Sequence, residues 1–461
     1  LNDVGFNKTK LIIILNDNQM SISKNVGGLS KYLNNIRMAP KYNKLKTDIN
    51  ASLEQSEIGK NIAFKISKVK DSIKQLVVPS MLFENMGVKY IGPIDGHDIS
   101  TMTDVLCKAK EMEGPVIIHT ITQKGKGYAL AEESPIKYHG VGPFNLDSGE
   151  MIASPKNSYS KAFGTALIKL SEENKKIVAI TAAMPEGTGL SCYAKKFKNR
   201  IFDVGIAEEH AVTMAAGMAS NGVKPVVAIY STFLQRAYDQ IIHDVCLQNL
   251  PVVFAIDRAG IVGEDGETHQ GIMDVSFLST IPNMTIIQPK CLGEVHMLLK
   301  YALSLNKPVA IRYPRGGDVI NTLEPLKDVK EGKWELISKG NKVCVIAGGR
   351  MLQHAKKASD MLYEKGVNVE LINATFIKPI DEEMLDSIVQ KEYNILIIED
   401  NMLHGGLGSA ITDYLSNTNF NKKIKRLGYE DFVHQGNLDI LYKMHKLDFE
   451  NISKEILELY E

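Results

Sequence analysis

Short apolar runs alternate with amphipathic segments along the whole chain. In the first third, apolar runs at Lys10–Asp17 and Gly114–Thr122 predict buried strands, and the amphipathic segment Thr101–Met112 predicts a helix between them. Strands that alternate with helices are typical of parallel sheets. The pattern therefore predicts an α/β fold.

The same alternation continues in two further sections, each behind a linker. Linkers rich in turn-forming or polar residues are expected at Val141–Ser158 and Asn321–Ile337. Three doubly wound, mostly parallel sheets follow from this pattern, in domains at residues 1–146, 157–319 and 336–461. The strands predicted in the last two domains are Lys176–Met184, Arg200–Ile206, Pro225–Thr232, Pro251–Gly260, Met284–Pro289, Pro308–Gly316, Lys342–Gly349, Asn368–Thr375 and Asn394–Asn401. The lysine-rich interval Asn43–Gln75 predicts surface helices or a mobile excursion.

Composition narrows the class of protein. The 461 residues include 54 basic and 54 acidic ones, so no net charge supplies the long-range field of a nucleic-acid or membrane-surface binder. The longest apolar runs are too short to cross a bilayer. Five cysteines occur singly, which favours a reducing cytoplasm over a disulfide framework or a zinc site. The chain begins with Leu directly before a predicted strand, and we expect it to be a piece of something longer.

Two adjacent acids open a helical pattern in the second section. If the helix starts near Ala207, the face of Glu208 continues through small apolar residues, whereas the face of Glu209 is more polar. Both acids could simply complement the helix dipole, but that role does not require a carboxylate on the apolar side. A buried carboxyl can hold a proton and act as a general acid. Glu208 is therefore a candidate catalytic residue.

Polar residues also follow the predicted strands of the first section. The sequence after Leu15 reads NDNQM, and the Asn18 side chain with the main-chain oxygen of Met20 would suit a hard cation such as Mg²⁺. An Asx-type turn explains the same residues. Lys124, in a glycine-rich turn, could contact a phosphate. His139 lies in a predicted loop, where a lone histidine is usually only solvated.

In the second section, charged and aromatic residues follow three strands. The loop Arg258–Gly271 carries Asp265 and His269 in a glycine-rich setting, which is plausible for an acid/base group and equally for a mobile surface loop. Arg312 and Arg315 form a fork suited to a phosphate. The glycine-rich turn His404–Ala410 could seat an anion at a helix start or serve close packing. A further group after one strand comprises Tyr230, Phe233 and Arg236.

Seven motifs occur in one order: LNDNQMSIS, YIGPIDGHD, QKGKGY, DVGIAEEHAV, STFLQRAYDQ, DRAGIVGEDGETHQG and RYPRG. In these motifs the chain resembles the 1-deoxy-D-xylulose-5-phosphate synthases, thiamine-diphosphate enzymes of the transketolase superfamily. The resemblance runs from the first predicted strand to the C-terminus. It implies condensation of pyruvate with D-glyceraldehyde 3-phosphate and release of CO₂, at the entry to isoprenoid, thiamine and pyridoxal synthesis.

The resemblance also implies roles for individual residues. Glu208 would hydrogen-bond N1′ of the cofactor's aminopyrimidine and favour the tautomer that deprotonates the thiazolium, and Phe233 would stack on the pyrimidine. His139, His269 and Asp265 would line the reacting centre. The remaining implied contacts are Ile22 and Ile206 to the bent cofactor, Asn18 and Met20 to Mg²⁺, Lys124 to the diphosphate, and Tyr230, Arg236, Arg258 and Arg315 to the acceptor and its phosphate.

The chain departs from the family at its beginning. The family carries a preceding segment with a G-D-G motif whose Asp binds Mg²⁺, and this sequence does not contain it. We therefore expect an incomplete first domain and little activity from this chain alone. The family implies a homodimer. Alternatives are another transketolase-superfamily enzyme, such as a transketolase or a 2-oxo-acid dehydrogenase β-type subunit, and a non-catalytic scaffold.

Overall fold

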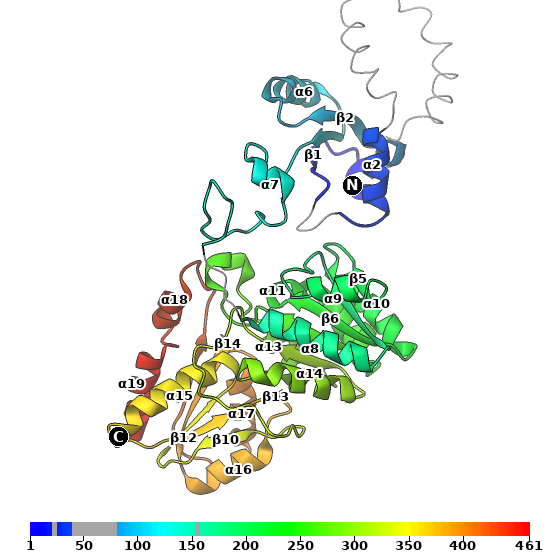
Figure 1. The fold of residues 1–461 in the computed structure, drawn as a ribbon. Coiled ribbons are helices and arrows are strands. Elements are labelled where there is room, and N and C mark those ends of the chain that lie inside the picture. Colours follow the sequence, from blue (N-terminus) through cyan, green and yellow to red (C-terminus); the bar gives the residue numbers. More distant parts are fainter. Residues whose placement is uncertain (21–24, 39–80, 153–156) are drawn as a thin grey trace, which may run out of the picture. The chain divides into compact units, whose positions relative to one another are not determined.

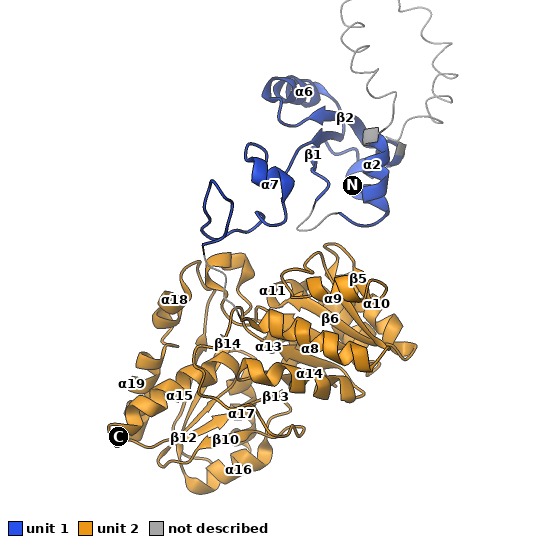
Figure 2. Ribbon diagram, viewed as in Figure 1, with its two compact units in different colours: residues 1–153 blue, residues 154–461 orange. Residues whose placement is uncertain are grey.

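The computed structural model describes residues 1–20, 25–38, 81–152 and 157–461 (Figure 1). Contacts divide the chain into two compact units, Leu1–Ala153 and Ser154–Glu461 (Figure 2). The expectations for Ile22 and for the interval Asn43–Gln75 concern residues outside the described ranges. No helix in the described part combines the length and the apolar character that a bilayer crossing requires. The three-domain boundaries stay a prediction.

The first unit is built on a three-stranded parallel sheet. Its strands are β1 (Ile12–Asp17), β3 (Val116–Ile121) and β2 (Lys89–Asp95), in the order β1-β3-β2. β3 is the central strand and is almost wholly buried, which explains its continuous apolar run. β1 and β3 confirm the predicted strands, whereas β2 was missed because Gly92 and Pro93 interrupt its apolar pattern. The helices are α1 (Asn2–Phe6), α2 (Gly28–Met38), α5 (Met81–Asn85), α6 (Ile99–Glu111) and α7 (Ala129–Glu133).

The second unit begins with a seven-stranded sheet, here called the pyrimidine sheet. All six strands predicted for this section are present and parallel. The order is β13-β8-β9-β7-β6-β4-β5, with β4 (Ile177–Thr181), β5 (Ile201–Asp203), β6 (Lys224–Tyr230), β7 (Val253–Asp257), β8 (Thr285–Ile287) and β9 (Val309–Arg312). The seventh strand, β13 (Phe376–Lys378), comes from the last section and pairs antiparallel with β8.

A five-stranded sheet, here called the C-terminal sheet, completes the second unit. Its order is β10-β12-β11-β14-β15, with β10 (Glu335–Ser338), β12 (Glu370–Asn373), β11 (Val343–Ala347), β14 (Asn394–Met402) and β15 (Ile424–Tyr429). β11, β12 and β14 confirm the predicted strands, and β10 is antiparallel to β12. The expected linker Asn321–Ile337 is wrong at its end, because β10 begins there at Glu335.

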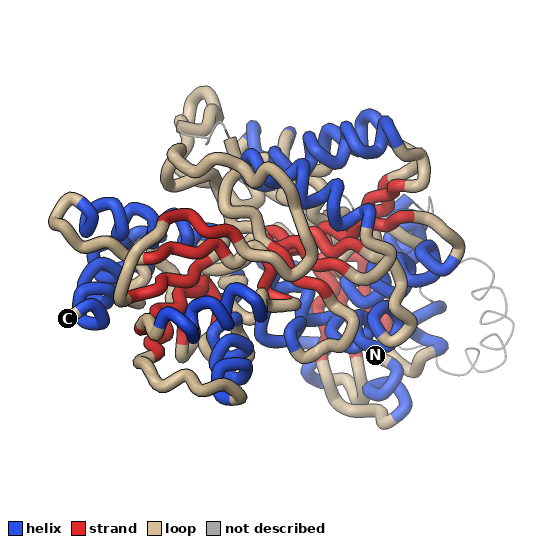
Figure 3. The backbone as a smooth tube through the Cα atoms, turned by 90° about the horizontal axis from the view of Figure 1, so that it is seen from below, coloured by secondary structure: helices blue, strands red, loops and turns tan. Residues whose placement is uncertain are grey.

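Helices pack against both sheets (Figure 3). The longer ones are α8 (Tyr159–Glu173), α10 (Glu208–Ser220), α14 (Val295–Ser304), α15 (Gly349–Tyr363), α16 (Glu382–Lys391), α17 (Leu407–Ser416) and α19 (Phe449–Tyr460). The shorter ones are α9 (Ser191–Lys196), α11 (Ser231–Leu234), α12 (Tyr238–Gln240), α13 (Asp274–Ser279) and α18 (Leu438–Met444). α15 and α19 bury apolar faces in one continuous core with β11 and β14. The α/β fold class is confirmed.

The glycine-rich turn at the start of α17 encloses a carboxylate of the chain itself. Glu399, on β14, accepts hydrogen bonds from the main-chain nitrogens of Leu407 (2.8 Å) and Gly408 (3.1 Å). A Cβ atom at Gly406 would collide with this carboxylate. Close packing is therefore the reason for the glycines, and Glu399 occupies the place that an anionic ligand would take at this helix start.

We expect Glu399→Gln to flatten the pH dependence of stability. Burial raises the pKa of Glu399 to about 7 from its ordinary 4.5, although the main-chain N–H groups oppose the shift. Between these values the folded chain binds more protons than the unfolded chain, so the free energy of unfolding falls as pH rises through 7. Urea unfolding between pH 5 and 8 should show this loss, at most about 3 kcal/mol, in the parent chain only.

The exposed acid Glu383, in the first turn of α16, provides the control. Glu383→Gln should keep the parent slope against pH. If the free energy of unfolding changed with pH by the same slope in the parent chain and in Glu399→Gln, Glu399 would not be the group responsible for the pH dependence.

Candidate active site

The first turn of α10 places a carboxylate in the interior of the second unit. α10 begins at Glu208, as predicted, and Glu208 is 1% exposed while Glu209 is exposed. The stripe that continues from Glu208 through Val212 and Ala215 is buried. The predicted helical phase is confirmed.

Arg236 binds the buried carboxylate. Its Nη1 atom donates to both oxygens of Glu208, at 3.0 and 3.1 Å. Arg236 lies in a short turn after α11, and its side chain is 48% exposed, so the pair closes the solvent side of Glu208. The resemblance assigns Arg236 to the acceptor phosphate. That role stays a prediction, and it would require the guanidinium to share or leave the carboxylate.

Three rings, those of Phe233, Tyr230 and His269, lie next to this ion pair and contact one another through Phe233. The Arg236 guanidinium lies 5.4 Å from the ring centre of Phe233. Phe233 meets His269 edge-on at 5.2 Å and stacks with Tyr230 at 5.9 Å. Phe233 and Tyr230 flank the end of β6, whereas His269 comes from the loop after β7. The structure thus brings five predicted residues, from three segments, into one connected group.

Next to Tyr230, Arg258 is held by a second buried carboxylate. Its guanidinium lies 4.0 Å from the Tyr230 ring centre and donates to Asp257 Oδ1 (2.9 Å) and to the main-chain oxygen of Gly187 (2.6 Å). Burial raises the pKa of Asp257, and the Arg258 cation opposes the shift. Burial also raises the pKa of Tyr230 to about 12, so its hydroxyl keeps its proton at neutral pH. Asp257 was missed, although a carboxylate ending an apolar strand is a visible signal.

The two arginines of the predicted fork have different environments. Arg315 is partly exposed and pairs with Asp265 at 3.3 Å, and it also donates to the main-chain oxygen of Val262. Arg312 is buried and binds both oxygens of Asp274. The expectation that Arg312 faces a phosphate is therefore wrong, because its guanidinium is committed to the interior.

In the first unit, the Asx-turn interpretation of NDNQM is confirmed. Asp17 Oδ1 accepts from the nitrogen of Gln19 (3.0 Å), and Asn18 Oδ1 accepts from the nitrogen of Met20 (2.9 Å). Within the described ranges, His, Cys, Asp and Glu form no group of three or more that could hold a metal. A cation here would depend on amide and main-chain oxygens, which fits the predicted Asn18 and Met20 ligands without testing them.

Buried polar residues below this turn were missed by the sequence analysis. His119, in the centre of β3, lies 3.3 Å from Asp17 Oδ2 and 2.7 Å from the Tyr90 hydroxyl. A histidine inside a continuous apolar run was the available signal. Elsewhere in the same unit, burial lowers the pKa of Lys124 and, with the nearby Lys124 cation, that of His139.

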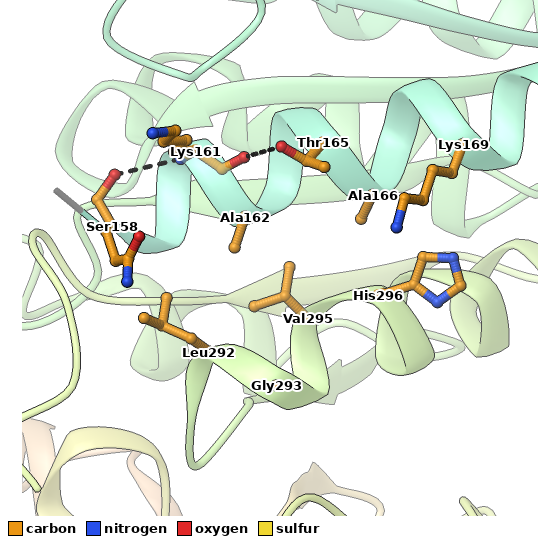
Figure 4. Close-up of a pocket in the computed structure, with 11 residues that line it drawn as sticks. Ser158, Lys161, Ala162, Thr165, Ala166, Lys169, Leu292, Gly293, Val295 and His296 are labelled. Atoms are coloured by element: carbon orange, nitrogen blue, oxygen red, sulfur yellow. Dashed lines mark hydrogen bonds between the residues drawn. The ribbon is translucent and has the colours of Figure 1, made fainter. Parts of the chain in front are cut away.

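A groove of about 400 Å³ lies between α8 and the segment Leu292–His296 (Figure 4). Lys161, Lys169 and His296 supply its polar walls, and Ala162 and Val295 its apolar floor. None of the predicted site residues lines it. The groove is therefore separate from the connected group that contains Glu208.

The family models that match this chain identify a transketolase-type enzyme, and the parallel-dominated sheets agree with that class. Family models described as transketolase, pyrimidine binding domain, and transketolase, C-terminal domain, match residues 156–317 and 332–452. A model for 1-deoxy-D-xylulose-5-phosphate synthase matches residues 1–122. The chain is 71% identical, over its whole length, to a 1-deoxy-D-xylulose-5-phosphate synthase of Clostridium beijerinckii. It belongs to the 1-deoxy-D-xylulose-5-phosphate synthase family.

Other comparisons agree with this assignment. A 1-deoxy-D-xylulose-5-phosphate synthase of Clostridium botulinum is 62% identical across the entire chain. The chain spans about three quarters of the length of both relatives (75% and 74%). The family uses thiamine diphosphate and joins pyruvate to D-glyceraldehyde 3-phosphate.

Two solved structures share the fold. A split gene transketolase, described as an inactive beta4 tetramer, is 28% identical, with a TM-score of 0.61 over 66% of this chain and 98% of that one. A transketolase from Campylobacter jejuni is 17% identical, with a TM-score of 0.55 over 99% of this chain and 74% of that one. The second likeness concerns the fold alone.

We expect Arg258→Met to destabilise the second unit by about 3 to 5 kcal/mol, because it leaves the Asp257 carboxylate buried without its cation. Urea unfolding measures the change. Adding Asp257→Asn should recover part of the loss, since the buried charge is then absent. A double variant no more stable than Arg258→Met would argue against the pair.

Proposed function

We propose that Glu208 is the carboxylate that shares a proton with N1′ of thiamine diphosphate when the complete enzyme condenses pyruvate with D-glyceraldehyde 3-phosphate, and that this chain alone has little activity. The supporting observation is its position: buried, in the first turn of α10, and two residues after Ile206, an apolar side chain left 56% exposed. Phe233 and Glu208 both contact the Arg236 guanidinium, and an aromatic ring, a carboxylate and an exposed apolar side chain together fit a flat, polar-edged heterocycle. When bound, thiamine diphosphate supplies the electron sink for loss of CO₂.

The other residues of the connected group receive roles by position. Phe233 offers a ring face to the pyrimidine, and Ile206 supports the cofactor's bend. His269 and Asp265, on one loop, exchange protons with pyruvate and the acceptor aldehyde. Tyr230 binds the acceptor through its protonated hydroxyl.

Three arginines are assigned to the acceptor phosphate. Arg315 is partly exposed and contacts Asp265 and the main-chain oxygen of Val262, which leaves further guanidinium donors for a phosphate. Arg258 is fixed by Asp257, which orients its guanidinium beside Tyr230. Arg236 would divide its donors between the phosphate and Glu208.

For the first unit, we assign the diphosphate end of the cofactor to Lys124 and Mg²⁺ to Asn18 Oδ1 and the main-chain oxygen of Met20. Burial lowers the pKa of Lys124, and a lysine ammonium in a glycine-rich turn suits a diphosphate contact. His139 is assigned to the reacting centre. Ile22 is assigned to the bent cofactor on the resemblance alone. We also propose a cytoplasmic homodimer with domains at residues 1–146, 157–319 and 336–461.

We expect Glu208→Gln to reduce synthase turnover by about 100-fold or more, because an amide cannot share the proton. Glu209→Gln is the matched control, since this neighbouring acid faces water, and it should keep turnover within about twofold. Product formation is measured for the 461-residue chain, from which we expect little turnover, and for the same chain preceded by the family segment with the G-D-G motif. Chelation of Mg²⁺ should abolish the turnover of the extended form.

A calorimetric titration separates the enzyme from the scaffold alternative. Saturable heat with thiamine diphosphate and Mg²⁺ is expected from the parent chain and from Glu209→Gln. The absence of saturable heat in both forms of the parent chain would support the scaffold. Equal losses in Glu208→Gln and Glu209→Gln would refute the role of Glu208.

A further inference from the structure

The loop Arg258–Ile272, here called the catalytic loop, connects β7 to α13 and carries Asp265 and His269. It contains two short 3-10 turns, and its ends are joined by main-chain hydrogen bonds between Gly260 and Gly271 (2.7 and 2.8 Å). A glycine-rich segment of this length loses much conformational freedom when it is ordered. Contacts from outside the loop must therefore compensate for that cost.

A carboxylate of the C-terminal sheet fixes the beginning of the loop. Asp400, near the end of β14, accepts from the main-chain nitrogen of Ile261 at 3.2 Å. Gly260 has a positive φ of 78°, and a Cβ atom there would collide with the same carboxylate. The loop backbone therefore lies directly on the Asp400 side chain.

Asp400 is itself held from three other elements, β15, α18 and β9. The Tyr429 hydroxyl donates to Oδ1 at 2.7 Å, and the Tyr442 hydroxyl donates to Oδ2 at 3.0 Å. Arg312 donates to its main-chain oxygen. Since Asp400 is only 6% exposed, these bonds give it one position.

A second segment of the C-terminal section, His434–Gly436, fixes the middle of the loop. The His434 ring lies 2.7 Å from a Glu267 carboxylate oxygen, and its main-chain oxygen accepts from Gln270 Nε2 at 3.0 Å. Gln435 Nε2 donates to the main-chain oxygen of Glu264 at 3.1 Å, and the main-chain nitrogen of Gly436 donates to the main-chain oxygen of Gly263 at 3.4 Å. The contacts lie on both sides of Asp265 and directly beside His269.

We propose that Asp400 and the segment His434–Gly436 position the catalytic loop, so that the C-terminal section sets where Asp265 and His269 lie. These are positioning residues, because they act through the loop. Only the chemistry delivered by the loop rests on the proposed function. The positioning stands on the hydrogen bonds themselves.

Two variants weaken the two anchors, the second by removing its side-chain contacts to Glu267 and Glu264 while its main-chain contacts remain. Asp400→Asn keeps the shape of the side chain but loses the charge and one acceptor oxygen. The double variant His434→Ala/Gln435→Ala removes exposed side chains only, so the fold should survive it. Asp381→Asn is the matched control. Asp381 is a buried residue of the C-terminal section, and its side-chain carboxylate accepts from the main-chain nitrogens of Trp334 and Met384.

Hydrogen exchange of the full chain, read by mass spectrometry, measures the loop directly. In both anchor variants we expect amides of residues 260–271 to exchange about tenfold faster or more, while α8 is unchanged. Asp381→Asn should keep loop exchange within about twofold of the parent chain. Where turnover is measurable, the anchor variants should lose kcat/KM for the acceptor and keep the parent affinity for thiamine diphosphate.

Unchanged loop exchange in the double variant would overturn the proposal, whether or not Asp400→Asn folds. Equal acceleration in Asp381→Asn would also overturn it, because general softening would then explain the effect. If the chain preceded by the family segment with the G-D-G motif were inactive while loop exchange responded as expected, the result would count against the proposed function alone.

Discussion

The buried guanidinium of Arg312 joins the two sheets of the second unit. It binds Asp274 with two donors, and it also reaches Gln288 and the main-chain oxygen of Asp400. These partners lie on α13, beyond the end of β8, and on β14, so three elements meet at one charge. A buried cation is costly unless its donors are satisfied, and these elements must therefore take their positions together. The loops at the strand ends, which carry the proposed chemistry, are built around that fixed point.

Helical phase found Glu208 because burial follows the 3.6-residue period, which one segment of sequence contains in full. Continuous apolar runs found most strands, because the strands of a parallel sheet are covered on both faces. The sequence pattern could not find the partner of Glu208, since Arg236 lies 28 residues away and is brought to it by β6 and α11. Nor could it find β13, whose short pattern makes sense only beside β8. Periodicity predicts whether a residue is buried. Which residue covers it depends on contacts between segments that are distant in the sequence.

Residue type alone left two further predictions ambiguous. Arg312 and Arg315 stand three positions apart and look alike in sequence, yet one is committed to Asp274 and the other stays available at the surface. The glycines near α17 suggest an anion, and the structure provides one in Glu399, eight residues before the first main-chain donor. In both cases the deciding group comes from another element, so local chemistry is a poor guide to whether a charge serves the fold or a ligand.

The position of β13 limits how the gene could recombine without exposing a sheet edge. It covers the β8 edge of the pyrimidine sheet with residues encoded far downstream, and Trp334 in turn donates to the main-chain oxygen of Phe376. An uncovered edge invites pairing with other chains. A recombination event that exchanged the pyrimidine-binding section without its C-terminal neighbour would expose that edge. The pyrimidine-binding section and the C-terminal section should therefore be inherited together, although separate family models describe them.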